Sequence, residues 1–107
     1  MVMLGGIQYY TGQFFNIPAI TQAAHAVGAI AGFDLAHAAG NVPLQLHQWQ
    51  VDFAVWCTYK YLNSGAGSIS AIFLHEKHFD LSNKIKFDGW WSHRPETRFQ
   101  KIGRAHV

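Results

Sequence analysis

Two residues of the sequence could do chemistry together, an acid and an amine that each follow an apolar stretch. Asp34 comes directly after the apolar residues 29–33, and Lys60 closely follows a second apolar stretch at 53–57. Stretches of this kind are typical of strands that are covered on both faces of a sheet. The carboxyl ends of parallel strands meet at one sheet edge, where ligands bind in open α/β folds. Asp34 and Lys60 are therefore expected to line one site.

Each residue alone also has a purely structural interpretation. Lys60 could pack its stem at the strand end and hold its amine in water, and Asp34 could cap a turn or a helix. Together they match the needs of pyridoxal phosphate, whose aldehyde forms a Schiff base with a lysine and whose ring nitrogen requires an anionic partner. His37 would add a group that can share a proton, and Tyr59 a hydroxyl suited to the ring oxygen or the phosphate.

The elements that would position these residues alternate between strand and helix patterns. Residues 2–4 and 68–74 resemble strands, and 63–67 form a turn. Asn16 can cap a helix with Pro18 near its start, and Gly28 is its expected end. Residues 44–51 suggest a short helix or an irregular crossover. The sequence thus predicts an α/β fold with a mostly parallel sheet and one short return connection.

Composition excludes several classes of protein. The chain has 107 residues, of which 50% are hydrophobic and 13% charged, so disorder driven by high charge is excluded. The net charge of +2 arises from scattered basic residues, which gives no footprint for nucleic acid. No apolar stretch reaches the roughly 18 residues of a membrane span, and the start lacks the basic flank of a signal peptide, so a cytoplasmic protein is expected. The single cysteine permits no internal disulfide.

Several stretches of the sequence resemble one enzyme family. The stretches FDLAHA at 33–38 and CTYKYLNSGAG at 57–67 resemble the kynureninases, which are fold-type-I pyridoxal phosphate enzymes similar to the class-V aminotransferases. The stretches IQYYTGQ at 7–13, GWWSH at 89–93 and TRF at 97–99 fit the same family. An aspartate followed by a lysine is shared with cysteine desulfurases, whereas the lysine's flanks and the Gly-Trp-Trp stretch indicate kynureninase.

The resemblance implies a role for several residues. Lys60 would form the Schiff base and Asp34 would bind the pyridine nitrogen. His37 would lie near the ring oxygen, while Tyr59 and Trp90 would contact the phosphate, and Tyr59 could donate a proton during the reaction. His93 belongs to a stretch that lines the substrate side in the family. The fold implied is the mostly parallel central sheet of a transferase-like large domain that binds pyridoxal phosphate.

The same resemblance implies the activity. Kynureninases hydrolyse a carbon–carbon bond of L-kynurenine or its 3-hydroxy form, giving anthranilate or 3-hydroxyanthranilate and L-alanine, in tryptophan catabolism and pyridine nucleotide biosynthesis. They work as homodimers on small-molecule substrates, with no role for nucleic acid or membrane. Two alternatives stay open: another class-V-like pyridoxal phosphate enzyme such as a cysteine desulfurase relative, and an α/β interaction module without cofactor.

Three further motifs are interpreted as structural. Residues 75–78, HEKH, hold two histidines three apart, whereas a metalloprotease helix needs them four apart, so a solvated strand exit is favoured over a metal site. The GAG stretch at 65–67 precedes a predicted strand, and we interpret it as a turn. Cys57 is expected to be a small buried apolar residue, and Trp49 and Trp56 to belong to the core. His25 and His47 have no partner visible in the sequence.

The ends of the chain suggest an incomplete domain. Residues 1–101 fit the central part of a cofactor-binding large domain, because the family's phosphate loop, stacking aromatic and carboxylate-binding arginine are not found. Residues 102–107, IGRAHV, can be encoded by ATC-GGA-AGA-GCA-CAC-GTC, the start of a widely used sequencing adapter. We therefore expect the tail to be adapter read-through and the chain alone to be inactive.

Overall fold

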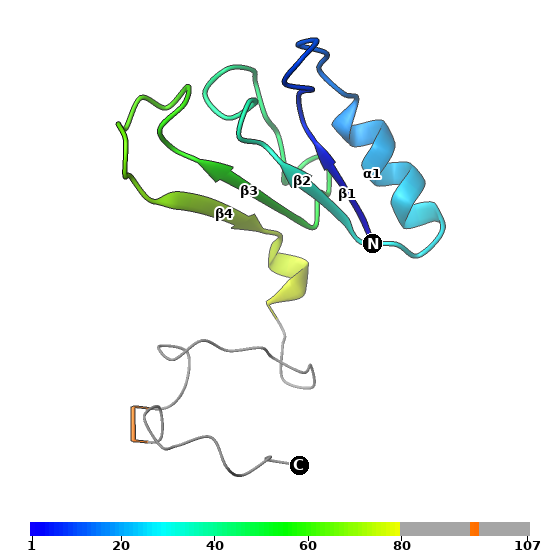
Figure 1. The fold of residues 1–107 in the computed structure, drawn as a ribbon. Helices are drawn as coiled ribbons and strands as arrows, with labels where there is room; N and C mark the ends of the chain where they lie inside the picture. Colours follow the sequence, from blue (N-terminus) through cyan, green and yellow to red (C-terminus); the bar gives the residue numbers. More distant parts are fainter. Residues whose placement is uncertain (80–94, 97–107) are drawn as a thin grey trace, which may run out of the picture.

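The chain forms a four-stranded sheet with one α-helix beside it. The computed structural model describes residues 1–79 and 95–96 (Figure 1). Its elements in chain order are β1 (Val2–Gly5), α1 (Ile17–Ala26), β2 (Ala31–Asp34), β3 (Phe53–Cys57), β4 (Ser70–Leu74) and the 3-10 turn η1 (Glu76–His78). Within these residues, no helix has the length and apolar character needed to cross a membrane.

The strand order confirms the predicted α/β sheet. The strands lie side by side as β1-β2-β3-β4, with β1 and β2 parallel, β2 and β3 parallel, and β4 antiparallel to β3 (Figure 1). The antiparallel pair is the short return connection that the turn at 63–67 predicted. Because β2 and β3 run the same way, the residues that follow them emerge at the same end of the strands. We call this end of the sheet the carboxyl edge, and the opposite end, where β2 and β3 begin, the amino edge.

Helix α1 begins and ends at the residues that the sequence indicated. Asn16 caps it by accepting a hydrogen bond from the Ala19 amide at 3.1 Å, and Pro18 stands in the first turn, where a missing N–H costs little. Gly28 follows the helix with a φ of +71°, a conformation that glycine adopts without strain. The helix buries Ile17, which packs into the core with Phe33 of β2.

The core lies between α1, the sheet and the segments that follow β2. Residues 31–33 of β2 are buried on both faces, as predicted for an apolar strand inside a sheet. Phe33, Leu35 and Val51 are fully buried. Burial of a large apolar side chain stabilises the fold by roughly 1.5–3 kcal/mol. The core anchors β2 most firmly, and β2 is the strand that carries Asp34.

Some expectations differ from the structure in detail. The strand at 2–4 was expected to be buried, but Met3 is 50% and Leu4 44% exposed, because β1 is an edge strand of the described sheet. Strand β2 begins at Ala31 and β4 at Ser70, each two residues later than the apolar pattern suggested. Residues 46–50 form turns, and no regular helix lies within 44–51, so the irregular alternative was the right one.

Candidate functional site

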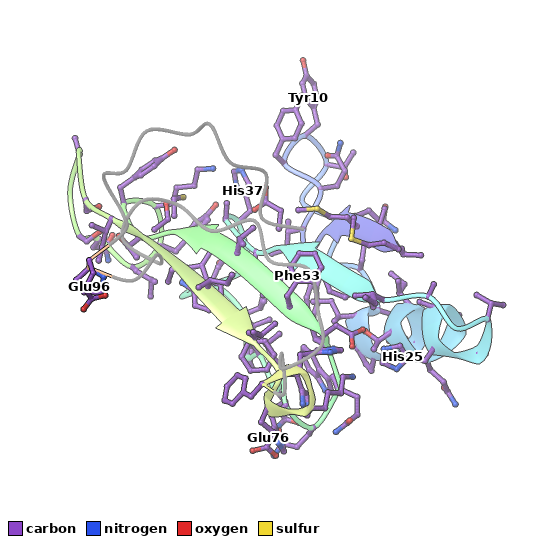
Figure 2. All side chains as sticks on the ribbon, turned by 90° about the horizontal axis from the view of Figure 1, so that it is seen from below. Tyr10, His25, His37, Phe53, Glu76 and Glu96 are labelled. Atoms are coloured by element: carbon purple, nitrogen blue, oxygen red, sulfur yellow. The ribbon has the colours of Figure 1, made fainter. Side chains whose placement is uncertain are left out.

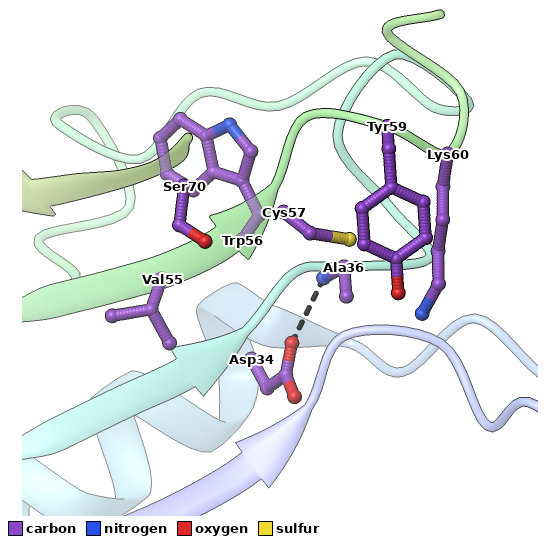
Figure 3. A pocket seen from close by; sticks show the side chains of 8 residues that line it. All are labelled: Asp34, Ala36, Val55, Trp56, Cys57, Tyr59, Lys60 and Ser70. Atoms are coloured by element: carbon purple, nitrogen blue, oxygen red, sulfur yellow. Dashed lines mark hydrogen bonds between the residues drawn. The ribbon is translucent and has the colours of Figure 1, made fainter. Parts of the chain in front are cut away.

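The structure brings Asp34 and Lys60 to one pocket at the carboxyl edge. The pocket has a volume of about 280 Å³. It is lined by Asp34, Ala36, Val55, Trp56, Cys57, Tyr59, Lys60 and Ser70 (Figure 3). In Figure 3 the side chains of Tyr59 and Lys60 extend from the loop after β3 toward the side of the pocket on which Asp34 lies. The predicted meeting of acid and amine is therefore observed.

Asp34 is the last residue of β2 and presents its carboxylate at the strand end. Its Oδ1 accepts a hydrogen bond from the Ala36 amide at 2.9 Å, the Asx-type contact that orients a carboxylate at a turn (Figure 3). A carboxylate can accept about four hydrogen bonds. Among the described residues, the Asp34 carboxylate accepts only one, from the Ala36 amide. Asp34 thus keeps acceptor capacity for a cationic group placed in the pocket.

Among the described residues, Lys60 is paired with a base and not with an acid. Its Nζ lies 3.2 Å from Nε2 of His37, and 5.8 Å from the ring centre of Tyr59. His37 stacks on Tyr9 and meets Tyr61 edge to face, with ring centres 6.4 and 6.3 Å apart. A neutral imidazole beside the amine can accept one of its protons. The contact supports the prediction that His37 is a proton-sharing partner.

A cluster of hydroxyl groups, unforeseen from the sequence, fixes the loop that holds Lys60. Thr58 donates from Oγ1 to the Ile69 carbonyl, and Ser64 bonds to the hydroxyls of both Thr58 and Ser68 at 2.7 Å. The Ser64 amide also donates to the Thr58 carbonyl at 3.2 Å. These bonds close the chain on itself around Lys60 and hold the loop against the start of β4.

Two residues expected to belong to the core also face the pocket. Cys57 was expected to be buried, but it is only half-buried and belongs to the lining of the pocket, where its thiol points toward the side of Tyr59 (Figure 3). Trp56 packs against the core, as predicted, and lines the pocket as well. Both residues end β3, where the strand leaves the sheet and its last side chains meet the ligand side.

The amino edge holds a second polar cluster, centred on Asp52. Its side chain is 4% exposed and accepts hydrogen bonds from the Ala31 amide at 2.7 Å, His25 at 2.7 Å, Lys77 at 2.8 Å and His78 at 2.6 Å. Since an ionised carboxylate only accepts, both imidazoles donate through Nε2. Burial raises the pKa of this carboxyl, but the four donors outweigh burial and hold the pKa well below the usual aspartate range.

The histidines of this edge correct two expectations. His25 and His47 were expected to lack partners, yet His25 bonds Asp52, and His47 stacks on His75 and lies 3.2 Å from Glu76. The strand exit at 75–78 was expected to be solvated, but His75 is 4% exposed. Figure 2 shows His25 and Glu76 at the end of the sheet opposite His37 and Tyr10. No group of three or more His, Cys, Asp or Glu within 1–79 and 95–96 is arranged to hold a metal ion.

Two candidate residues fall where the structure gives no description. Trp90, expected at the phosphate, and His93, expected near the substrate, lie outside the described residues, as do the GWWSH stretch, residues 97–99 and the tail at 102–107. The site that can be built therefore consists of Asp34, His37, Tyr59 and Lys60.

These four residues fit the chemistry of pyridoxal phosphate. The group needs an amine for its aldehyde and an anion for its ring nitrogen, and both line one pocket here. The amine of Lys60 lies beside an imidazole, which suits a lysine that must give up a proton to bond an aldehyde. Asp34 has acceptor capacity left for the ring nitrogen.

Comparison with known protein families agrees with the fold. The family model of the class-V aminotransferases matches residues 1–102, which is nearly the whole chain. The chain therefore belongs to the aminotransferase class-V family.

Curated relatives that are 54–60% identical to the chain carry the name kynureninase. The chain is 60% identical to a kynureninase of Rattus norvegicus over 107 residues, covering 100% of this chain and 23% of that protein. It is 60% identical over 104 residues to a kynureninase of Dictyostelium discoideum and 58% over 100 residues to one of Flavobacterium psychrophilum, covering 94% of this chain each time. It spans 23% and 24% of those two relatives, so about a quarter of their length.

Proposed function

We propose that the chain is a central segment of a pyridoxal phosphate-dependent kynureninase, which hydrolyses L-kynurenine to anthranilate and L-alanine. The observation that supports this most directly is the pocket in which Asp34 and Lys60 meet, with His37 at 3.2 Å from the lysine amine. The relatives named kynureninase, at 58–60% identity, support the choice of substrate.

Each residue of the pocket has a part in this proposal. Lys60 holds the cofactor through its amine, and after substrate binding the same amine is placed to take a proton. His37 accepts the proton that Lys60 must lose, and Tyr59 presents its hydroxyl to the phosphate or to the departing group. Asp34 keeps a positive charge on the ring nitrogen by ion pairing. The cofactor supplies the electron sink that the chain's own side chains lack.

The reaction balances with water as the only co-substrate. The bond between the γ-carbonyl carbon and the β-carbon breaks, the hydroxyl of water goes to the carbonyl carbon to give the carboxyl group of anthranilate, and a proton goes to the β-carbon to give alanine. Lys60 and Tyr59 are placed to transfer protons. Proton transfer by a positioned side chain typically contributes about 10²–10⁴-fold to the rate of a reaction.

The test uses the full-length protein that contains this segment. Borohydride reduction in the presence of pyridoxal phosphate should attach a pyridoxyl group to Lys60, found by peptide mass spectrometry, while Lys77 at the other edge serves as the internal control. Lys60→Ala should abolish the label, the visible absorption of the bound cofactor and anthranilate release. A label on another lysine, or no label at all, overturns the assignment; the latter outcome favours the cofactor-free interaction module.

Product analysis separates the proposal from a related enzyme. A labelled Lys60 with no anthranilate from L-kynurenine, but sulfide from cysteine in the presence of a reductant, indicates a desulfurase relative that shares Asp34, His37 and Lys60. Anthranilate in stoichiometric yield with alanine indicates kynureninase.

The proposal has four further parts. The resemblance supports the homodimer and the assignment of residues 1–101, the composition supports the cytoplasm, and the codons that can encode IGRAHV support the assignment of the tail. The full-length enzyme is a homodimer, which light scattering after gel filtration measures, and it resides in the cytoplasm, which fractionation measures. Residues 1–101 belong to the cofactor-binding large domain, and 102–107 are adapter read-through. Genomic sequence that encodes IGRAHV in place would refute the assignment of the tail.

A further inference from the structure

Asp52 is bonded to more elements than any other residue described above. Besides the four donors to its carboxylate, its amide donates to the Ala31 carbonyl at 3.0 Å and its carbonyl accepts from the His75 amide at 2.9 Å. Through these bonds it joins α1, β2, the end of β4 and η1 at the residue that precedes β3. It lies at the amino edge, so it touches none of the residues of the pocket.

The bonds between Asp52 and Ala31 form a closed pair. The Ala31 amide donates to the Asp52 carboxylate, and the Asp52 amide donates to the Ala31 carbonyl. Ala31 is the first residue of β2 and Asp34 is its last, while Asp52 directly precedes β3, which leads to Lys60. One end of the β2–β3 pair thus carries the closed pair of bonds, and the other end carries the site.

The ladder between these two strands is short, which makes such an anchor consequential. It consists of three register pairs, Gly32 with Phe53, Phe33 with Ala54 and Asp34 with Val55. A slip by one residue would turn every side chain of a strand to the opposite face and displace it by about 3.3 Å. Asp34 would then leave the face on which Lys60 approaches.

A buried carboxylate with four donors resists such a slip more than a backbone bond does. Charge-assisted hydrogen bonds are roughly twice as strong as neutral ones, and any slip would leave a charged group without partners inside the protein. The groups that face Asp52 come from each neighbouring element: His25 from α1, and Lys77 and His78 from η1. Nearby, His75 follows β4 and Glu76 is exposed and paired with His47.

We propose that Asp52 is a positioning residue for the pyridoxal phosphate site: it locks the β2–β3 register from the amino edge and thereby holds Asp34 opposite Lys60. The proposal rests on the proposed function for its chemical meaning, but the register itself is a property of the fold. It assigns a functional effect to a carboxylate that cannot touch cofactor or substrate.

The experiment compares Asp52→Asn with wild type in the full-length holoenzyme. Asparagine keeps the size of the side chain but replaces one acceptor oxygen by a donor and removes the charge. We expect folding, judged by circular dichroism, to persist while the pH midpoint of the cofactor's visible band moves and kcat falls on the order of 100-fold, the scale of a 1 Å misplacement. Glu76→Gln, which alters an exposed carboxylate at the same edge, should change neither quantity.

A second pair of variants keeps the test decisive if Asp52→Asn does not fold. His25→Ala removes one donor to Asp52, and His25→Gln restores a donor at that position. The alanine variant should move the band midpoint in the same direction by a smaller amount, and glutamine should return it toward wild type. The proposal is overturned if Asp52→Asn folds and leaves both the band midpoint and kcat unchanged. If Asp52→Asn does not fold, the proposal is overturned by a folded His25→Ala variant whose band midpoint equals that of wild type.

Failure of the proposed function is distinguishable from failure of this inference. If wild type shows no visible band and no label on Lys60, the proposed function is wrong, and the crystal structure of Asp52→Asn, or of His25→Ala, decides the register instead. A register that has slipped or lost the pairing of Asp34 with Val55 supports the lock. Unchanged pairing overturns it.

Discussion

The two edges of the sheet treat their carboxylates in opposite ways. At the carboxyl edge, Asp34 is exposed and uses a single protein donor among the described residues, and Lys60 is held by an imidazole. At the amino edge, Asp52 is almost fully buried and accepts from four donors. Residues of the same type, eighteen positions apart, therefore serve a reacting site and a structural joint.

The number of hydrogen bonds that a carboxylate already accepts determines whether its charge is available to a ligand. A carboxylate such as Asp52, which accepts from four donors, has no capacity left for a ligand, and its removal lowers the free energy of unfolding. An unsaturated one such as Asp34 contributes little to the fold, but it can bind a cation that arrives from outside. Substitutions at the two edges should accordingly differ in their effect on stability: the free energy of unfolding should fall at Asp52 and change little at Asp34, whereas kcat should fall at both.

The largest effect on activity is expected from Asp34→Asn. Loss of the charge opposite the ring nitrogen should lower kcat roughly 100- to 1,000-fold, the scale for removal of one preorganised electrostatic group. The free energy of unfolding should change little, because the side chain is exposed and makes one hydrogen bond. Steady-state kinetics with L-kynurenine and urea unfolding of the full-length protein measure the two effects. Equal loss of stability and activity would mean that Asp34 is structural.

Acid should act through the amino edge. The folded pKa of Asp52 lies below its unfolded value, so the unfolded state binds more protons at low pH. The stability from Asp52 is therefore complete above about pH 5 and declines as the pH falls through the ordinary aspartate range and on toward the folded pKa. Unfolding free energies measured from pH 6 to pH 2 should fall more steeply in wild type than in Asp52→Asn. Parallel curves for the two proteins would contradict this assignment.

A substitution within the β2–β3 ladder, between the two edges, should lower the free energy of unfolding. A Cβ added at Gly32 would overlap the ring of Phe53, the residue opposite it in the β2–β3 ladder. Gly32→Ala is expected to cost about 1–3 kcal/mol, the usual range for overpacking, as measured by urea unfolding. Shortening the neighbour should relieve the overlap, so the cost should shrink in a Phe53→Ala background. An identical cost in both backgrounds would exclude the ring as its cause.

The smallest effect is expected at Glu76. Its carboxylate is 70% exposed and its partner His47 61% exposed, so water screens their interaction. Glu76→Gln should change the free energy of unfolding by less than about 0.5 kcal/mol, in contrast to the removal of Asp52, which bonds the other two residues of η1. A loss of more than about 1 kcal/mol would show that the exposed pair shares in the buried cluster.

The sequence predicts those parts of the fold that depend on neighbours along the chain. Strand β3 was predicted with its observed bounds, because five apolar residues follow an acid and precede a polar turn. The cap at Asn16 and the end at Gly28 follow from local hydrogen bonding and local φ preference. The meeting of Asp34 and Lys60 follows from one rule about parallel strands, which needs no side-chain detail.

The features that the sequence left hidden depend on contacts between distant segments. His25 and His78 lie 27 and 26 positions from Asp52, and no local pattern marks them as its partners. Whether Cys57 faces the core or the pocket depends on where β3 leaves the sheet, which is a matter of a single residue. The exposure of β1 depends on which strand borders it, and no property of residues 2–4 encodes that.

The hydroxyl cluster after β3 bears on how this loop can change in length. Ser64 ties the chain back to Thr58 before the tip of the hairpin is reached, so Lys60 lies on the closed side of that tie. Beyond it, Gly65 and Gly67 have no heavy atom within 4 Å of the place where a Cβ would stand. A change in length at the tip would therefore leave the bond between Ser64 and Thr58 intact, and with it the place of Lys60. Exchange of either glycine for another residue would be strained, because φ is +86° at Gly65 and +80° at Gly67.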